Sequence, residues 1–293
     1  MEIFTGSGVA LVTPFNEDKT INYKALGELL DFQIKNQTDA ILVCGTTGEA
    51  STLTDEEQLE CIRFSAEYVN KRVTLIAGAG SNDTAHGVNL AQMAEKSGAD
   101  ALMLVTPYYN KCTQSGLIKH FTAQAEAVSI PIIIYNVPTR TSLNILPKTV
   151  YELSLVPNIV AVKEASGDIV QVSEIARLCG EDFAIYSGND DYTLPVMSIG
   201  GKGVISVIAN FIPKQTHEMV SKFLEGDIKE SRRLFLEMLP LAKALFAEVS
   251  PVPVKAAMNL LGMNVGGCRM PLCEIEENNL ALLKQEMKNY GLI

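Results

Sequence analysis

Lys163 is the residue whose place in the sequence most directly suggests chemistry. It follows the apolar run at residues 159–162 and precedes the short segment 164–167, which contains small and polar residues. An unbroken apolar run is typical of a strand buried on both faces. Burial lowers the pKa of an amine from its usual value of about 10.4, so that a neutral nucleophile becomes available. Such an amine can form a Schiff base with a ketone. A strand can also end in an ordinary solvated lysine, and the neighbouring elements must decide between the two interpretations.

Eight short apolar runs recur along the chain and predict eight strands. They lie at residues 8–13, 39–43, 73–77, 101–105, 131–135, 159–163, 183–187 and 204–207. Segments with helical spacing separate them, which is the arrangement that repeated strand–helix units require. Two architectures can be built from eight such units: a closed (β/α)8 barrel and an open, doubly wound sheet.

The glycine pattern favours the barrel. A dinucleotide-binding sheet carries G-x-G-x-x-G after its first strand, whereas the best candidate here, residues 78–83, follows the third strand and lacks the last glycine. The Gly45–Glu49 segment also lacks the lysine of a P-loop. We therefore expect an α/β (β/α)8 TIM barrel over residues 1–225, followed by a C-terminal helical appendage over residues 226–293.

The sequence also predicts particular helices and helix ends. Thr54 and Glu57 form an S/T-x-x-E capping box before a helix at 55–70, whose predicted buried face carries Leu59, Ile62, Ala66 and Val69. Three glycines are expected to close helices, namely Gly98, Gly180 and Gly226. In the tail, helices are expected at 229–248, 251–262 and 274–289.

Polar residues follow most of the predicted strands, at the barrel end where enzymes of this fold place their active sites. In chain order they are Thr46 and Thr47, then Thr106 to Asn110 with Tyr108 and Tyr109, then Tyr135 and Arg140, then Lys163, then Ser187 to Asp191 with Gly188, and finally Ile205 within the eighth strand. Each has an ordinary alternative as a turn, an aromatic lid or a surface cation. Together they favour a single site.

These residue types define a chemistry. A lysine converts a ketone into an imine, which acidifies the neighbouring carbon. A phenol with hydrogen-bonded hydroxyls can move the proton, and an arginine fork or backbone N–H groups can hold carboxylates. The combination indicates a metal-free lyase or aldolase that acts on 2-oxo acids.

Composition excludes several other classes of protein. The chain has 293 residues, a formal net charge of −10 and 47% hydrophobic residues, without a basic run. We therefore expect no nucleic-acid partner and no membrane association. Six cysteines without a CxxC pair, together with only three histidines, argue against zinc and favour reduced thiols. The N-terminus does not resemble a signal peptide, so a cytoplasmic location is expected.

From Thr5 to the C-terminal helices, the chain resembles the dihydrodipicolinate synthase family. The motifs that carry the resemblance are Gly45-Thr46-Thr47-Gly48-Glu49-Ala50, Thr106-Pro107-Tyr108-Tyr109-Asn110, Tyr135-Asn136-Val137-Pro138-Thr139-Arg140-Thr141, Val162-Lys163-Glu164-Ala165 and Gly203-Val204-Ile205-Ser206-Val207. The resemblance implies a Schiff-base condensation of pyruvate with L-aspartate 4-semialdehyde, which gives 4-hydroxy-tetrahydrodipicolinate in lysine and diaminopimelate biosynthesis. It implies no cofactor and no metal.

The resemblance also implies a role for each residue. Lys163 would bind pyruvate covalently, and Tyr135, Thr46 and Tyr109 would transfer protons. Thr47 and the Ile205 backbone would hold the pyruvyl group. Arg140 would hold the carboxylate of the second substrate, and Gly188 would also contribute to substrate binding. Tyr109 would serve the neighbouring subunit across a dimer interface, within a homotetramer that is a dimer of dimers.

Two alternatives are compatible with the same fold. Sister enzymes, namely 2-keto-3-deoxy sugar acid aldolases and N-acetylneuraminate lyase, share the barrel and its lysine. Arg140 and the Tyr108-Tyr109-Asn110 run favour the synthase over them. A barrel that has lost catalysis and only binds a ligand is the third possibility. The presence of Lys163, Tyr135, Thr46 and Tyr109 argues against it.

The chain departs from the family pattern in two places. The usual Asn-Pro-Ile-Pro-Val-Lys is replaced by Ser250-Pro251-Val252-Pro253-Val254-Lys255. In relatives that lysine inhibits, histidines stand at the positions of Asp55 and Gln58, and an acid stands at that of His86. We therefore expect weak or absent inhibition by lysine, because a cationic effector finds His86 where the inhibited relatives have an acid, although Asp55 could partly compensate.

Overall fold

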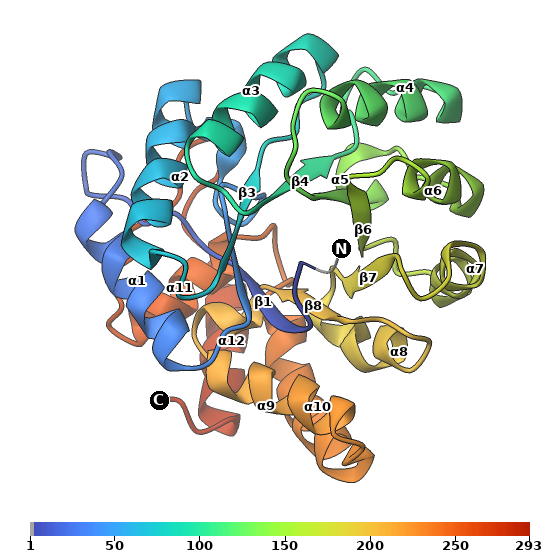
Figure 1. Cartoon of the computed structure of the whole chain (residues 1–293). Coiled ribbons are helices and arrows are strands. Elements are labelled where there is room, and N and C mark those ends of the chain that lie inside the picture. The colour runs from blue at the N-terminus through green and yellow to red at the C-terminus, as the bar shows by residue number, and fades with distance from the viewer. Residues whose placement is uncertain (1–2) are drawn as a thin grey trace.

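A computed structural model describes residues 3–293 of the chain, in which eight parallel strands form one closed barrel (Figure 1). The strands are β1 (Gly6–Ala10), β2 (Ala40–Val43), β3 (Thr74–Gly78), β4 (Ala101–Val105), β5 (Ile132–Asn136), β6 (Ile159–Glu164), β7 (Ala184–Ser187) and β8 (Gly203–Ser206). Each strand pairs with the next, and β1 pairs with β8 to close the barrel. This confirms the predicted barrel and rules out the open sheet.

Helices surround the barrel and connect its strands, as Figure 1 shows in a view along the barrel. They are α1 (Tyr23–Lys35), α2 (Asp55–Val69), α3 (Thr84–Lys96), α4 (Gln114–Ala125), α5 (Pro138–Thr141), α6 (Pro147–Ser154), α7 (Ile169–Cys179), α8 (Thr193–Met197), α9 (Pro213–Leu224), α10 (Ile228–Ala244), α11 (Val252–Leu260) and α12 (Glu277–Asn289). Three short 3-10 turns, η1 (Ala50–Thr52), η2 (Asp190–Tyr192) and η3 (Ile208–Asn210), lie in loops that follow β2, β7 and β8.

The first strand differs from its predicted range. It starts at Gly6 and ends at Ala10, whereas the apolar run suggested 8–13. The segment after Ala10 is buried but leaves the sheet: the Leu11 amide still donates to the Leu42 carbonyl of β2, whereas the Val12 amide donates to the side-chain oxygen Oδ1 of Asn210. The apolar run therefore placed the end of the strand too late, because a buried loop that follows a buried strand is equally apolar.

Helix α2 confirms its predicted start but not its predicted face. Thr54 and Glu57 form the reciprocal capping box. The residues of α2 that are fully buried are Gln58, Cys61, Ile62, Ser65 and Val69, while Leu59 and Ala66 are only partly buried. The buried face of α2 therefore includes small and polar residues that the apolar pattern did not mark. Gln58 belongs to this face because its Nε2 donates a 2.6 Å hydrogen bond to the Gly78 carbonyl at the end of β3.

The predicted glycines do close their helices. Gly180 caps α7, and Gly98 and Gly226 follow the last residues of α3 and α9, all three with positive φ. In the tail, α10 ends four residues earlier than predicted and α12 begins three residues later.

The apolar core has two layers. The smaller cluster fills the barrel interior and includes Phe4, Met103, Ile133, Tyr135 and Ile205. The larger cluster lies between the strands and the surrounding helices. Side chains alternate along each strand, so one set faces the interior and the other faces the helices. The interior set ends at the open mouth of the barrel, where polar side chains replace apolar ones.

The tail helices pack on the barrel. Helix α10 packs on α9, and α12 packs on α10 and α11. Lys255 of α11 forms a buried 2.6 Å ion pair with Glu49, in the loop that follows β2. The tail is therefore attached to one of the loops that carry predicted site residues.

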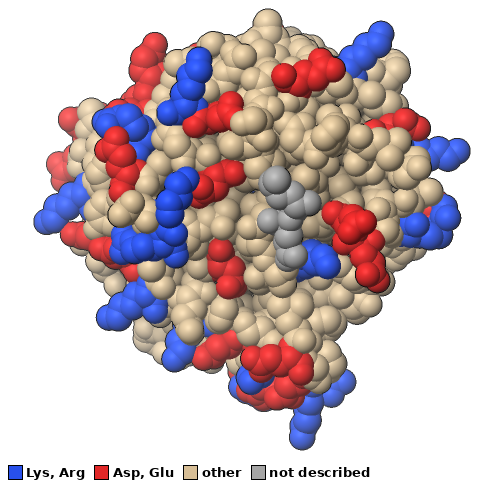
Figure 2. Space-filling view, viewed as in Figure 1, with Lys and Arg blue, Asp and Glu red and all other residues tan. Residues whose placement is uncertain are grey.

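The surface carries both signs of charge. On the face of the barrel where the N-terminus lies, Lys and Arg side chains are scattered among Asp and Glu (Figure 2). Within residues 3–293, no helix is long and apolar enough to cross a membrane.

Candidate active site

Lys163 lies at the end of β6, where its side chain is only 4% exposed. It is the register partner of Tyr135 on β5, so both side chains project from the same face of the sheet. The Lys163 Nζ lies 4.4 Å from the centre of the Tyr135 ring. Burial lowers the pKa of Lys163 to about 7; the negative charge of Asp190 acts in the opposite direction, and the positive charge of Arg140 lowers it further. A neutral amine is therefore available near neutral pH.

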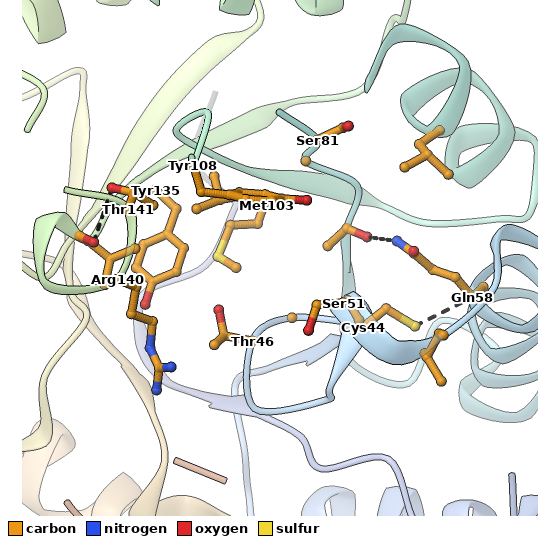
Figure 3. A pocket seen from close by; sticks show the side chains of 18 of the residues that line it. Cys44, Thr46, Ser51, Gln58, Ser81, Met103, Tyr108, Tyr135, Arg140 and Thr141 are labelled. Carbon is orange, nitrogen blue, oxygen red and sulfur yellow. Dashed lines mark hydrogen bonds between the residues drawn. The ribbon is translucent and has the colours of Figure 1, made fainter. Parts of the chain in front are cut away.

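Tyr135 is buried beside this amine. Burial raises the pKa of its phenol to about 12, while the charge of Arg140 and a hydrogen bond with Thr46 act to lower it. Figure 3 shows the phenol oxygen pointing toward the Thr46 hydroxyl, with the Arg140 guanidinium on the same side. The phenol thus stays protonated at neutral pH. It can pass a proton to a bound substrate, with the Thr46 hydroxyl as its hydrogen-bond partner.

A cavity of about 300 Å³ joins most of the predicted residues. Six of them line it, namely Thr46, Thr47, Tyr135, Arg140, Lys163 and Gly188. Val207 and the tail residues Phe246, Glu248, Val249 and Ser250 are also in its wall. The residues come from the ends of β2, β5, β6, β7 and β8, as expected for a site at the mouth of a barrel.

Two predicted residues do not line this cavity. Ile205 is completely buried in the barrel-interior cluster that also contains Tyr135. Tyr109 is 93% exposed and has a left-handed backbone, with φ of 70°. Within one chain, the structure therefore leaves the Tyr109 side chain outside the site.

Arg140 is held by the tail. Its Nη2 donates a 3.2 Å hydrogen bond to the main-chain carbonyl of Ser250. This contact does not use the side chain of residue 250, so the serine that replaces the usual asparagine leaves it intact. The rest of the guanidinium fork is available to a ligand carboxylate.

A second cavity of about 380 Å³ adjoins the first and shares Thr46, Tyr135 and Arg140 with it (Figure 3). Asp55, Gln58 and His86 all line it. His86 Nε2 lies 2.9 Å from Asp55 Oδ2, and Gln58 donates to the Gly78 carbonyl. Asp55 is thus already paired within the chain.

Sequence reasoning did not single out Asp190. This residue is buried, and its Oδ2 accepts 3.1 Å hydrogen bonds from the Val207 and Ile208 amides. Burial raises the pKa of Asp190, and the charge of Lys163 counteracts that shift. Its position after Gly188 was visible in the sequence, but an acid in a loop is more often solvated, and only the fold shows that it is buried near the amine.

A polar cluster behind the sheet supports Lys163 and Tyr135. Their neighbours in sequence, Glu164 and Asn136, are register partners on the opposite face. Asn136 Nδ2 donates to both Glu164 oxygens, at 3.2 and 3.0 Å, and Glu164 also accepts from the Ser166 amide and from Gln171. These bonds tie the ends of β5 and β6 together and so fix the two reactive side chains relative to each other.

Residues 3–293 contain no group of three or more His, Cys, Asp or Glu side chains arranged to hold a metal ion. The six cysteines are free thiols.

A closed (β/α)8 barrel with a buried amine and phenol at its mouth is the arrangement of a barrel enzyme with its site at the carboxyl ends of the strands. The sequence profile of the dihydrodipicolinate synthetase family matches residues 3–290. The chain belongs to this family, as its motifs predicted.

Individual relatives agree with this assignment over their whole length. A 4-hydroxy-tetrahydrodipicolinate synthase of Thermoanaerobacter sp. (strain X514) is 59% identical over 294 residues, covering 100% of this chain and 99% of the relative. The crystal structure of dihydrodipicolinate synthase from Aquifex aeolicus has a TM-score of 0.96 at 46% identity and 99% coverage of both chains. The enzyme from Cyanidioschyzon merolae, with lysine bound, has a TM-score of 0.97 at 40% identity and full coverage of both chains.

Proposed function

We propose that the chain condenses pyruvate with L-aspartate 4-semialdehyde to give 4-hydroxy-tetrahydrodipicolinate, the first committed step of lysine and diaminopimelate biosynthesis. The observation that carries this proposal is the buried Lys163 amine, with its pKa lowered to about 7, facing the Tyr135 ring at 4.4 Å. The relatives described above carry the synthase name, and none of them favours the sugar-acid aldolase or the inactive barrel.

The first half of the reaction activates pyruvate. The neutral Lys163 amine attacks the ketone carbon, and loss of one water gives an imine. Removal of a proton from the pyruvyl methyl group converts the imine into an enamine. Tyr135 supplies and recovers protons through Thr46, while Thr47, the Ile205 backbone and the Gly188 region hold the pyruvyl group. No cofactor is needed, because the iminium nitrogen withdraws the electrons.

The second half builds the ring. The enamine carbon attacks the aldehyde carbon of the second substrate, whose carboxylate Arg140 holds, and this forms the carbon–carbon bond and a hydroxyl. The substrate's own ammonium group gives up a proton and attacks the imine carbon as an amine; the Lys163 nitrogen takes up a proton as its bond to that carbon breaks. The cyclic product leaves, and the lysine amine is restored.

We also propose that the enzyme is a cytoplasmic homotetramer, a dimer of dimers in which Tyr109 completes the proton relay of the neighbouring subunit. The 93% exposure and left-handed backbone of Tyr109 support this, because a tyrosine held out from the surface in a strained conformation suits a partner's site.

The reaction is tested by incubating the protein with both substrates and measuring the cyclic product. Formation of that product only when both substrates are present is the expected result. Retro-aldol cleavage of a 2-keto-3-deoxy sugar acid, without synthesis of the cyclic product, would favour the sister enzymes instead.

L-Lysine is expected to inhibit this enzyme weakly or not at all. The ammonium group of an effector in the second cavity would meet His86 in place of an acid, and Asp55 is already paired with that histidine. Initial rates measured over a range of lysine concentrations check this. Half-inhibition below about 1 mM, equivalent to about 4 kcal/mol of binding, would contradict it.

A further inference from the structure

Glu248 is an acidic residue in the wall of the 300 Å³ cavity that Lys163 and Arg140 also line. It belongs to the segment between α10 and α11. Neither the resemblance nor the reaction described above gives this acid a role. An acid that lines a cavity for anionic substrates repels them unless it recognises a positive group.

The carboxylate is held in one orientation. Its Oε2 accepts a 3.0 Å hydrogen bond from the Glu276 amide and a 2.6 Å bond from Asn279 Nδ2, both at the start of α12. In the described part of the chain, Oε1 accepts no hydrogen bond and Glu248 pairs with no cation. One oxygen is therefore anchored while the other remains available.

Arg140 lies on the same side of the cavity. It donates to the Ser250 carbonyl, two residues beyond Glu248. Since Cα atoms two residues apart in a chain are at most about 7 Å apart, the guanidinium reaches main chain close to this acid. Arg140 and Glu248 do not form an ion pair with each other, so each can bind a ligand group of opposite charge.

We propose that Glu248 determines specificity for the second substrate by accepting a hydrogen bond from its α-ammonium group, while Arg140 holds its α-carboxylate. The two charges match the head group of an amino acid, in which one carbon separates an ammonium from a carboxylate. This inference rests on the proposed function, and it adds that the enzyme selects an α-amino aldehyde over the same aldehyde without the amine.

The first test compares the wild-type enzyme with E248Q, which keeps an oxygen for α12 but loses the negative charge. The KM for aspartate semialdehyde is measured together with the inhibition constant of succinate semialdehyde, which lacks the amine. Loss of a charge-assisted hydrogen bond is expected to raise this KM about 10-fold or more. The inhibition constant of succinate semialdehyde and the KM for pyruvate should not rise, because neither anion has an ammonium group for Glu248 to bind.

N279A is the matched control, because it removes the Asn279 bond to Glu248 but leaves the carboxylate charged and still held by the Glu276 amide. Its melting temperature is compared with that of E248Q, and it should keep the wild-type preference for the amino aldehyde. An unchanged preference in E248Q, or an equal loss in N279A, would overturn the proposal. Borohydride labelling of wild-type protein with pyruvate distinguishes failure of the proposed function from failure of the role of Glu248. Absence of labelling counts against the proposed function itself.

Discussion

At the scale of single residues, the site depends on an amine that the barrel keeps out of water. Lys163 is 4% exposed and its pKa is lowered to about 7, mainly by burial. The amine is therefore partly neutral, and nucleophilic, at neutral pH. Burial also lowers the stability of the folded state, because the lysine of the unfolded chain binds a proton that the folded lysine does not. Reactivity and stability are therefore opposed at this position.

K163M is expected to abolish activity and to stabilise the protein at pH 7. Between pH 7 and 10.5, the unfolded chain binds a proton that folded Lys163 does not, so the stability of the wild type rises with pH across this range. Methionine removes that difference, and the gain at pH 7 should be on the order of 2–4 kcal/mol. Urea unfolding at pH 7 and above pH 10 measures it. A variant that is less stable than wild type at pH 7 would contradict the account.

At the scale of elements, the loop after β2 is fixed by the tail. Glu49 has a left-handed backbone, with φ of 55°, and its carboxylate bonds both the Lys255 amine and the Arg269 amide. The Lys255 Nζ also donates to the Gly267 carbonyl and lies 4.2 Å from the centre of the Phe15 ring. These contacts fix the loop that carries Thr46 and Thr47.

K255M is expected to cost about 3–5 kcal/mol, because it leaves the Glu49 carboxylate buried without its cation. The double variant E49Q/K255M, which has no buried charge at this position, should recover part of that loss. Urea unfolding of the wild type, E49Q, K255M and the double variant forms the thermodynamic cycle. Equal losses in K255M and in the double variant would show that the ion pair is not responsible.

The elements also show what sequence can predict here. Strands buried on both faces produce continuous apolar runs, so the eight strands and the polar residues at their ends were predictable. The contact between Glu49 and Lys255 joins residues far apart in the chain and leaves no local pattern. The same is true of Glu248, which lies outside the barrel strands and enters the cavity only because the tail folds back onto its mouth.

At the scale of the whole molecule, the cavity of a single chain is lined by every predicted catalytic residue except Tyr109. The Tyr109 side chain is exposed and does not line the cavity of its own chain. If this tyrosine serves a partner, the functional unit is at least a dimer. A dimer of one subunit without Tyr109 and one subunit without Lys163 then has one intact site. That site uses Lys163 of the first subunit and Tyr109 of the second.

Y109F and K163A subunits are expected to have little activity alone and to regain it when dissociated, mixed and reassembled. Random pairing makes about half of the dimers mixed, each with one intact site, so recovery of about a quarter of the wild-type activity is expected. Y109F alone and K163A alone, each dissociated and reassembled without the other, are the comparisons and should stay inactive. Wild-type activity in Y109F alone would remove Tyr109 from the mechanism.

In the proposed reaction Lys163 attacks pyruvate as a neutral amine, and borohydride trapping tests this step. Protein is incubated with pyruvate and borohydride across a pH series, and the modified peptide is identified by mass spectrometry. We expect a single pyruvate-dependent adduct on Lys163, with an initial labelling rate that falls as pH decreases through about 7. An adduct on another lysine, or labelling that does not depend on pyruvate, would contradict it.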